Sequence, residues 1–177
     1  PSRRPDSPRS WRRNGWSGVI ERVVENWLTN VNERGYEIAF CQMLCNKGFR
    51  VLHAGKHGQA EQGKDIIAID PDDIACGFQL KTGDFDLAGW RKIHDQIVEL
   101  AELPIQHPSV PKGIKHRSFF VTTGEVNDPV RLNINSLNAT LVSRGFGPVE
   151  TILKGQLLRD FIEGHGTFLP KELTDFK

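Results

Sequence analysis

The sequence predicts an α/β protein with one mixed β-sheet flanked by helices. Three observations predict this class. Apolar residues along the 177-residue chain follow helical and strand-like periods, in the order helix, helix, three strands, helix, strand, helix, strand, helix. Short links join the first three strands, which favours an antiparallel meander. Helices separate the last two strands, and such crossovers require parallel pairing, so the sheet is expected to be mixed.

The first two elements are predicted to be helices. Over residues 19–31 the apolar side chains recur along one helical face. A second helix is expected over residues 36–46, with Gly48 as its C-terminal stop. Glu37 falls in the first turn of this predicted helix, where the helix dipole favours a carboxylate.

Three strands are predicted to follow. The first covers residues 49–55, which read FRVLHAG. The second and third cover residues 63–70 and 74–83, two runs rich in β-branched residues on either side of a Pro-Asp-Asp cluster. These two runs are therefore expected to form a hairpin.

The C-terminal half alternates between helices and strands. Helices are predicted over residues 87–103, 129–143 and 156–163, and strands over residues 118–124 and 148–155. The run SFFVTTG has almost no polar alternation, so this strand is expected to be buried on both faces.

Composition and charge are those of an ordinary globular chain. The net charge of +1 at pH 7 does not by itself indicate a nucleic-acid binder. Three cysteines without CxxC spacing argue against a disulfide framework and against a zinc ribbon. Because no apolar run has the length of a membrane span and no signal peptide opens the sequence, a cytoplasmic location and no membrane partner are expected.

A single domain is predicted over residues 19–177, with its core at about 36–163. Residues 1–18 are expected to be a basic arm, since arginine and tryptophan together suit phosphates and stacked bases. A disordered linker is an equally good interpretation. The sequence starts at Pro1 rather than methionine, which is expected either of a fragment of a larger protein with further domains or of a processed chain. The basic and aromatic residues of the arm are Arg3, Arg4, Arg9, Trp11, Arg12, Arg13 and Trp16.

Polar residues converge at one end of the predicted hairpin. Gln79 and Lys81 are two residues apart and share a strand face, which a tight hairpin folds back toward Asp65. Asp65 offers a carboxylate, Gln79 an amide oxygen and Leu80 a backbone carbonyl, and Mg²⁺ and Mn²⁺ prefer such oxygen ligands. Glu37 could add a second carboxylate, directly or through water. Lys81 would then orient the attacking water or stabilise charge on a phosphate.

These residues, in this order of elements, resemble the PD-(D/E)xK nuclease superfamily, which has the restriction-endonuclease-like fold. Within it the chain is most similar to the Mrr-type branch, which carries QxK in place of (D/E)xK. GFRVLHAG resembles the family's strand before the aspartate, FFVTTG its fourth strand, and VETILKGQLLRDF its closing strand and helix. The resemblance spans about residues 36–162.

The resemblance implies a metal-dependent endonuclease that hydrolyses phosphodiester bonds in DNA, expected to be double-stranded. It further implies an effector domain of a restriction or anti-phage defence protein. Mg²⁺ or Mn²⁺ would be the cofactor, and the implied metal ligands are Asp65, Gln79, Leu80 and Glu37. The implied catalytic residues are Asp65, Gln79, Lys81 and Glu37. Cleavage of both strands by a domain with one site implies a homodimer or a transient pair on DNA.

Six residues are candidates for contacts with DNA. Most are basic side chains on predicted loops or on the arm, where contacts with phosphates are independent of sequence and weaken with salt. One is a polar residue on the helix after the QxK strand, a helix on which related nucleases often carry a polar residue that faces the active site. The six are Lys56, His57, Lys64, Gln96, Arg12 and Arg13.

Two other functions stay open. Gln79 leaves one negative charge fewer on the metal than a carboxylate would, so the domain could be a catalytically weak or inactive nuclease-like module that binds DNA. An RNA-directed nuclease with the same fold agrees equally well with the arm and the site.

Overall fold

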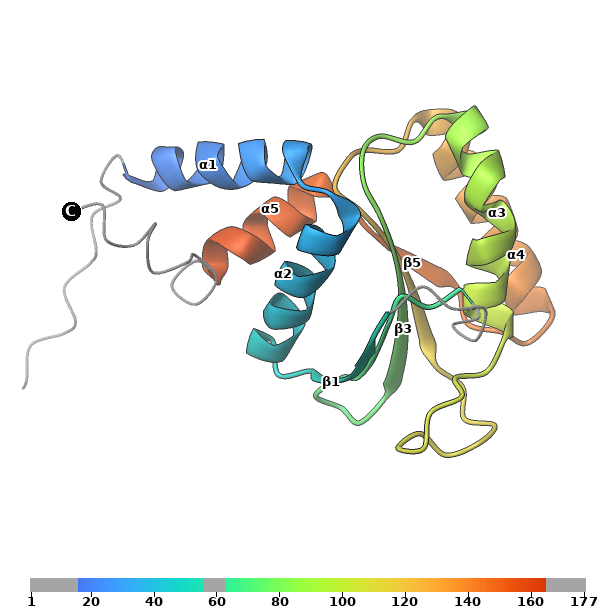
Figure 1. The fold of residues 1–177 in the computed structure, drawn as a ribbon. Coiled ribbons are helices and arrows are strands. Elements are labelled where there is room, and N and C mark those ends of the chain that lie inside the picture. The colour runs from blue at the N-terminus through green and yellow to red at the C-terminus, as the bar shows by residue number, and fades with distance from the viewer. Residues whose placement is uncertain (1–15, 56–62, 165–177) are drawn as a thin grey trace, which may run out of the picture.

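The computed structural model describes residues 16–55 and 63–164. Within these ranges the chain forms five helices and five strands (Figure 1). The helices are α1 (Trp16–Asn30), α2 (Glu33–Asn46), α3 (Leu87–Glu102), α4 (Asp128–Ser143) and α5 (Lys154–Glu163). The strands are β1 (Arg50–Ala54), β2 (Ile66–Ile69), β3 (Ala75–Lys81), β4 (Arg117–Thr122) and β5 (Val149–Ile152). This order of elements confirms the predicted one.

The five strands form one sheet in the order β1-β2-β3-β4-β5. Strands β1, β2 and β3 pair antiparallel, whereas β3, β4 and β5 pair parallel. The predicted fold class, an antiparallel meander extended by two parallel strands, is therefore confirmed. As expected for a strand covered on both faces, every residue of β4 after Arg117 is buried.

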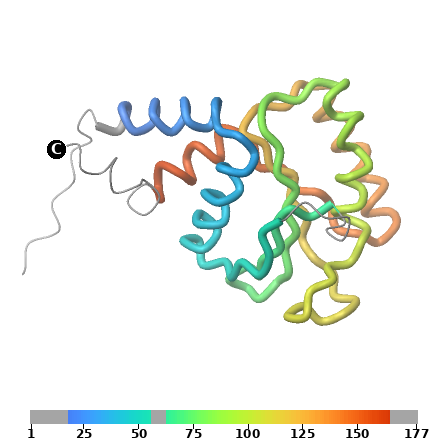
Figure 2. The backbone as a smooth tube through the Cα atoms, in the orientation of Figure 1, coloured from blue at the N-terminus to red at the C-terminus, as the bar shows by residue number. Residues whose placement is uncertain are grey.

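The helices cover the sheet in two groups. Helices α1, α2 and α5 lie on one side and α3 and α4 on the other (Figures 1 and 2). In β3, Phe78 and Leu80 belong to the core shared with the first group. Phe120 of β4, the register partner of Gln79, belongs to the core shared with α3 and α4. Because side chains alternate along a strand, Gln79 and Lys81 emerge on the α3–α4 face.

Both N-terminal helices begin earlier than the sequence predicts. Helix α1 starts at Trp16, so the last residues of the expected arm are helical, and residues 1–15 lie outside the described part of the chain. Helix α2 starts at Glu33, because the side chain of Asn32 accepts a hydrogen bond from the Gly35 N–H at 2.8 Å and caps the helix. The placement of Glu37 in the first turn is therefore wrong; Glu33 holds that position.

No helix within residues 16–55 and 63–164 is long and apolar enough to cross a membrane.

Candidate active site

Asp65 is held by the backbone on both sides. Its N–H donates to the carbonyl of Phe78 at 2.8 Å, and its carbonyl accepts from the N–H of Gly55 at 2.7 Å. Ile66 pairs with Phe78 in the β2–β3 ladder, so Asp65 lies one residue beyond the paired part of β2, beside the end of β3. The position of this residue therefore follows from the sheet itself.

The side chain of Asp65 bridges to the end of β3. Its Oδ2 accepts a hydrogen bond from Gln79 Nε2 at 2.7 Å and a second from the Leu80 N–H at 2.6 Å. Gln79 is only 4% exposed, so packing fixes its amide. The structure thus brings Asp65 together with Gln79 and the backbone of Leu80, and Lys81 follows on the same strand.

The edge of β3 is open beyond this point. Strand β2 begins at Ile66, opposite Phe78, so the last residues of β3 extend past it. The N–H of Leu80 points to this open edge, where Asp65 accepts its hydrogen bond. In an extended strand the N–H and carbonyl of one residue point to the same side, so the Leu80 carbonyl faces this edge too.

Lys81 contacts an acid that the sequence analysis did not single out. Its Nζ lies 3.6 Å from Oε1 of Glu33, in the first turn of α2. The start of α2 and the end of β3 lie at the same, upper end of the molecule in Figure 1. The sequence signal that could have identified Glu33 is Asn32, because asparagine is favoured at helix N-termini and would start the helix at the next residue.

Glu37 lies one helical turn further along α2 than Glu33, on the same face. It is half-buried and lies close to Cys41. Burial first, and the Glu37 carboxylate second, raise the pKa of the Cys41 thiol to about 11.

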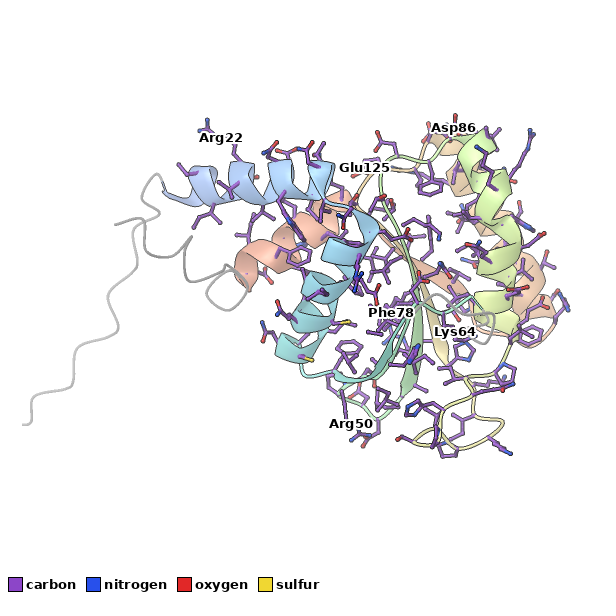
Figure 3. All side chains as sticks on the ribbon, viewed as in Figure 1. Arg22, Arg50, Lys64, Phe78, Asp86 and Glu125 are labelled. Carbon is purple, nitrogen blue, oxygen red and sulfur yellow. The ribbon has the colours of Figure 1, made fainter. Side chains whose placement is uncertain are left out.

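Lys64 does not lie on an exposed loop as predicted. Its side chain is 1% exposed, and its Nζ donates to the carbonyl of Leu103 at 2.8 Å, beyond the end of α3. Burial lowers its pKa to about 8, although the charge of Glu99 opposes this. In Figure 3, Lys64 lies on the α3 side of the sheet. A contact between Lys64 and DNA is incompatible with this burial.

The other candidates for DNA contacts are placed only in part. Gln96 is exposed on α3, and its backbone carbonyl lies against Gly63. A Cβ at position 63 would come within 2.5 Å of that carbonyl oxygen, so the loop before Asp65 packs on α3. Lys56, His57, Arg12 and Arg13 lie outside the described residues.

The end of β3 is fixed by the loop after β4. The backbones of Gly83 and Gly124 are in direct contact, since a Cβ at position 124 would lie 2.2 Å from the carbonyl carbon of Gly83. Thr122 Oγ1 donates to the Gly83 carbonyl at 2.6 Å, and the Gly83 N–H donates to Thr123 Oγ1 at 3.1 Å. These contacts hold the chain that carries Lys81.

The donor set fits a divalent cation with few protein ligands. Within the described ranges no three His, Cys, Asp or Glu side chains cluster as a metal site. Mg²⁺ nevertheless keeps several waters and often takes only one or two carboxylates. Asp65 and the Leu80 carbonyl suit it. Gln79 directs its NH₂ group at Asp65, so its oxygen becomes a ligand only after the amide rotates.

Comparisons with known proteins give little further information. No protein-family model and no curated protein matches the chain. A crystal structure of a repair endonuclease from Pyrococcus abyssi is similar, with a TM-score of 0.39 and 16% sequence identity. The match covers 70% of this chain and 48% of that one, so the chain spans about half the length of that protein. A likeness this remote carries no weight for function, which has to be argued from the site.

Proposed function

We propose that this protein is a divalent-metal-dependent nuclease that hydrolyses phosphodiester bonds in DNA. The observation that supports it is the bridge from Asp65 to Gln79 and Leu80, with Lys81 following on the same strand. A carboxylate, a backbone carbonyl and an ammonium at one open strand edge suit phosphodiester hydrolysis. The same residues carry the resemblance to the PD-(D/E)xK superfamily and its QxK branch.

Each residue has a distinct role in this proposal. Asp65 and the Leu80 carbonyl would hold Mg²⁺ or Mn²⁺, with Gln79 and Glu37 as further ligands, direct or through water. A bound cation would neutralise a phosphate oxygen and lower the pKa of a coordinated water. Lys81 would place its positive charge at the scissile phosphate and stabilise the charge that develops there. Gln79 meanwhile orients the Asp65 carboxylate through its hydrogen bond.

The wider role is proposed on the resemblance alone. Duplex DNA is the proposed substrate, and a homodimer or a transient pair on DNA would allow both strands to be cut. The same resemblance suggests an effector domain in restriction or anti-phage defence.

A nuclease-like module that binds DNA without cutting it is the second candidate. One observation favours it: the Gln79 amide donates to Asp65, an arrangement that satisfies both groups without a cation. Asp65 would then be a structural residue at the hairpin end. Such a module would bind DNA equally well with and without a divalent cation.

Cleavage assays separate the two candidates. Purified protein is incubated with labelled duplex DNA, single-stranded DNA and structured RNA in Mg²⁺, in Mn²⁺ and in EDTA. We expect metal-dependent cleavage of the duplex and a loss of about 10²–10³-fold in rate for both Asp65→Asn and Lys81→Met. Asp95→Asn is the matched control, because Asp95 is 99% exposed on α3. Intact nucleic acid in every metal, with normal binding, would contradict the nuclease and favour the module.

A further inference from the structure

Glu33 lies beside the candidate site, and the function proposed above does not use it. Its Oε1 lies 3.6 Å from Lys81 Nζ, and it comes from a helix end that Asn32 caps. The contact joins a helix on one side of the sheet to the end of a strand whose polar side chains emerge on the other. It is possible because β3 extends past β2 and leaves room at the sheet edge.

The ion pair between Lys81 and Glu33 is weak enough for Lys81 to change partners. The side chains of Lys81 and Glu33 are 21% and 45% exposed, so water screens their attraction. A phosphate group carries its own charge and can displace Glu33 from the ammonium at little cost. Lys81 therefore has two competing partners: Glu33 in the protein alone and a phosphate in a complex.

The charges around Lys81 decide which partner is favoured. At the end of β3 the group holds two carboxylates, Asp65 and Glu33, and one ammonium, Lys81, so it has an excess of one negative charge. Glu37, one turn further along α2, adds further negative charge. A phosphate approaching this group is repelled. A divalent cation on Asp65 reverses the sign, and the same phosphate is then attracted.

We propose that Glu33 is a positioning residue that holds Lys81 until a divalent cation is bound, so that binding of a nucleic-acid phosphate here depends on the cation. The proposal rests on the proposed function, because it assigns Lys81 to the phosphate and Asp65 to the cation. It deepens that function by giving an order of binding, cation first and phosphate second. The acid assigned here is Glu33, because its carboxylate lies within reach of the Lys81 ammonium.

Equilibrium binding tests this order without any need for cleavage. The affinity for a fluorescently labelled short duplex is measured by anisotropy in EDTA and in Ca²⁺, which takes oxygen ligands as Mg²⁺ does. We expect the wild-type protein to bind more tightly in Ca²⁺. Glu33→Gln should raise the affinity in EDTA about two- to fivefold and so reduce the effect of Ca²⁺. Glu33→Asp should largely restore the wild-type ratio of the two affinities.

Two controls separate a specific role from simple loss of charge. Glu21→Gln removes the same charge from the exposed side of α1 and should change neither affinity. In a Lys81→Met background, Glu33→Gln should raise the EDTA affinity less than it does alone, because the competition for the ammonium is gone. Equal effects in the two backgrounds would overturn the proposal, as would an EDTA affinity that Glu33→Gln leaves unchanged.

The outcome is independent of cleavage. A protein that never cuts DNA, yet binds it in the expected cation-dependent and Glu33-dependent way, would contradict the nuclease but support the order of binding. A protein that cuts DNA while Glu33→Gln changes no affinity would retain its proposed function and lose this inference. Thermal unfolding of each variant shows whether the cap of α2 is intact, and Glu33→Asp keeps the test valid if Glu33→Gln does not fold.

Discussion

The units β3–α3 and β4–α4 have the same backbone plan and carry different chemistry. They pair in constant register from Cys76↔Arg117 to the isolated bridge Phe85↔Val126. A Thr-Gly-acid sequence follows each strand, and a side-chain cap then starts each helix, Asp86 for α3 and Asn127 for α4.

The two strands differ where the polar site lies. Gln79 and Lys81 of β3 pair with Phe120 and Thr122 of β4, both of which are fully buried. Strand β4 has a parallel neighbour on each side, whereas β3 has the short antiparallel strand β2 on one side and extends past it. The open edge, which Asp65 partly fills, is therefore what allows polar side chains on β3. The neighbours of a strand, rather than its loop, decide where a site can form.

The largest expected effect is a difference in the free energy of unfolding between alanine substitutions at the two loop glycines, Gly124 and Gly83. Gly124→Ala would place a Cβ 2.2 Å from a backbone carbon of Gly83, and we expect a loss of at least about 3 kcal/mol in the free energy of unfolding. Gly83→Ala meets no atom within 4 Å and only strains a residue with φ of +80°, which costs about 1 kcal/mol. Chemical denaturation measures both, and similar losses would mean that the loops do not touch as described.

A second substitution, at Gln79, tests the polar site that distinguishes β3 from β4. Gln79→Glu would set two carboxylates against each other where an amide now donates to Asp65. We expect a loss of about 2 kcal/mol in the free energy of unfolding in EDTA, because a hydrogen bond is replaced by repulsion. Mn²⁺ should restore the loss, since the variant offers a second carboxylate ligand.

Denaturation with and without Mn²⁺ measures this effect. Gln156→Glu is the matched control, because it makes the same chemical change at an exposed position in the first turn of α5. Recovery in Mn²⁺ for both variants, or for neither, would argue against a cation at Asp65.

The smallest expected effect concerns how each helix is tied to the sheet. Asn138 of α4 bonds both backbone groups of Val149, and an amide does not titrate. His116 Nε2 instead bonds the Leu100 carbonyl of α3 at 2.8 Å. Burial lowers the pKa of His116; the hydrogen bond to Leu100 opposes this, and the charge of Lys64 adds to it.

The sign of the pH dependence follows from that direction. The unfolded chain, with a histidine pKa of about 6.5, binds more protons than the folded protein in the window just below that value. The free energy of unfolding should therefore fall as the pH drops through this window, and His116→Gln should flatten that slope. Urea denaturation over a pH series checks it. His94→Gln, at a half-exposed histidine of α3, shows whether the slope belongs to His116.

Most of the fold could be predicted because it depends on local patterns. Periodicity gives the elements, and the lengths of the links give the strand directions. The meeting of Asp65 with Gln79 and Leu80 was predictable for the same reason, since a hairpin brings its two strands into fixed register.

The errors concern features that local patterns do not contain. The start of α2 depends on the cap by Asn32, and without that cap the predicted helix did not include Glu33, the acid that contacts Lys81. The polar neighbours of Lys64 in the sequence predict an exposed side chain. The residue is nevertheless buried, because its stem lies in the space beside Gly77 of β3 and its ammonium donates to the Leu103 carbonyl beyond the end of α3. Neither Gly77 nor the Leu103 carbonyl can be linked to Lys64 from the sequence alone.

The buried path of Lys64 has a consequence for how this sequence can change. A Cβ at position 77 would lie 3.2 Å from both Cγ and Cδ of Lys64, so the absence of a side chain at Gly77 makes room for the lysine stem. Substitutions at position 64, just before β2, and at position 77, in β3, are therefore expected to depend on each other. In diverged homologues a larger residue at 77 should accompany a shorter one at 64, and this covariation would run beside Asp65 without involving it.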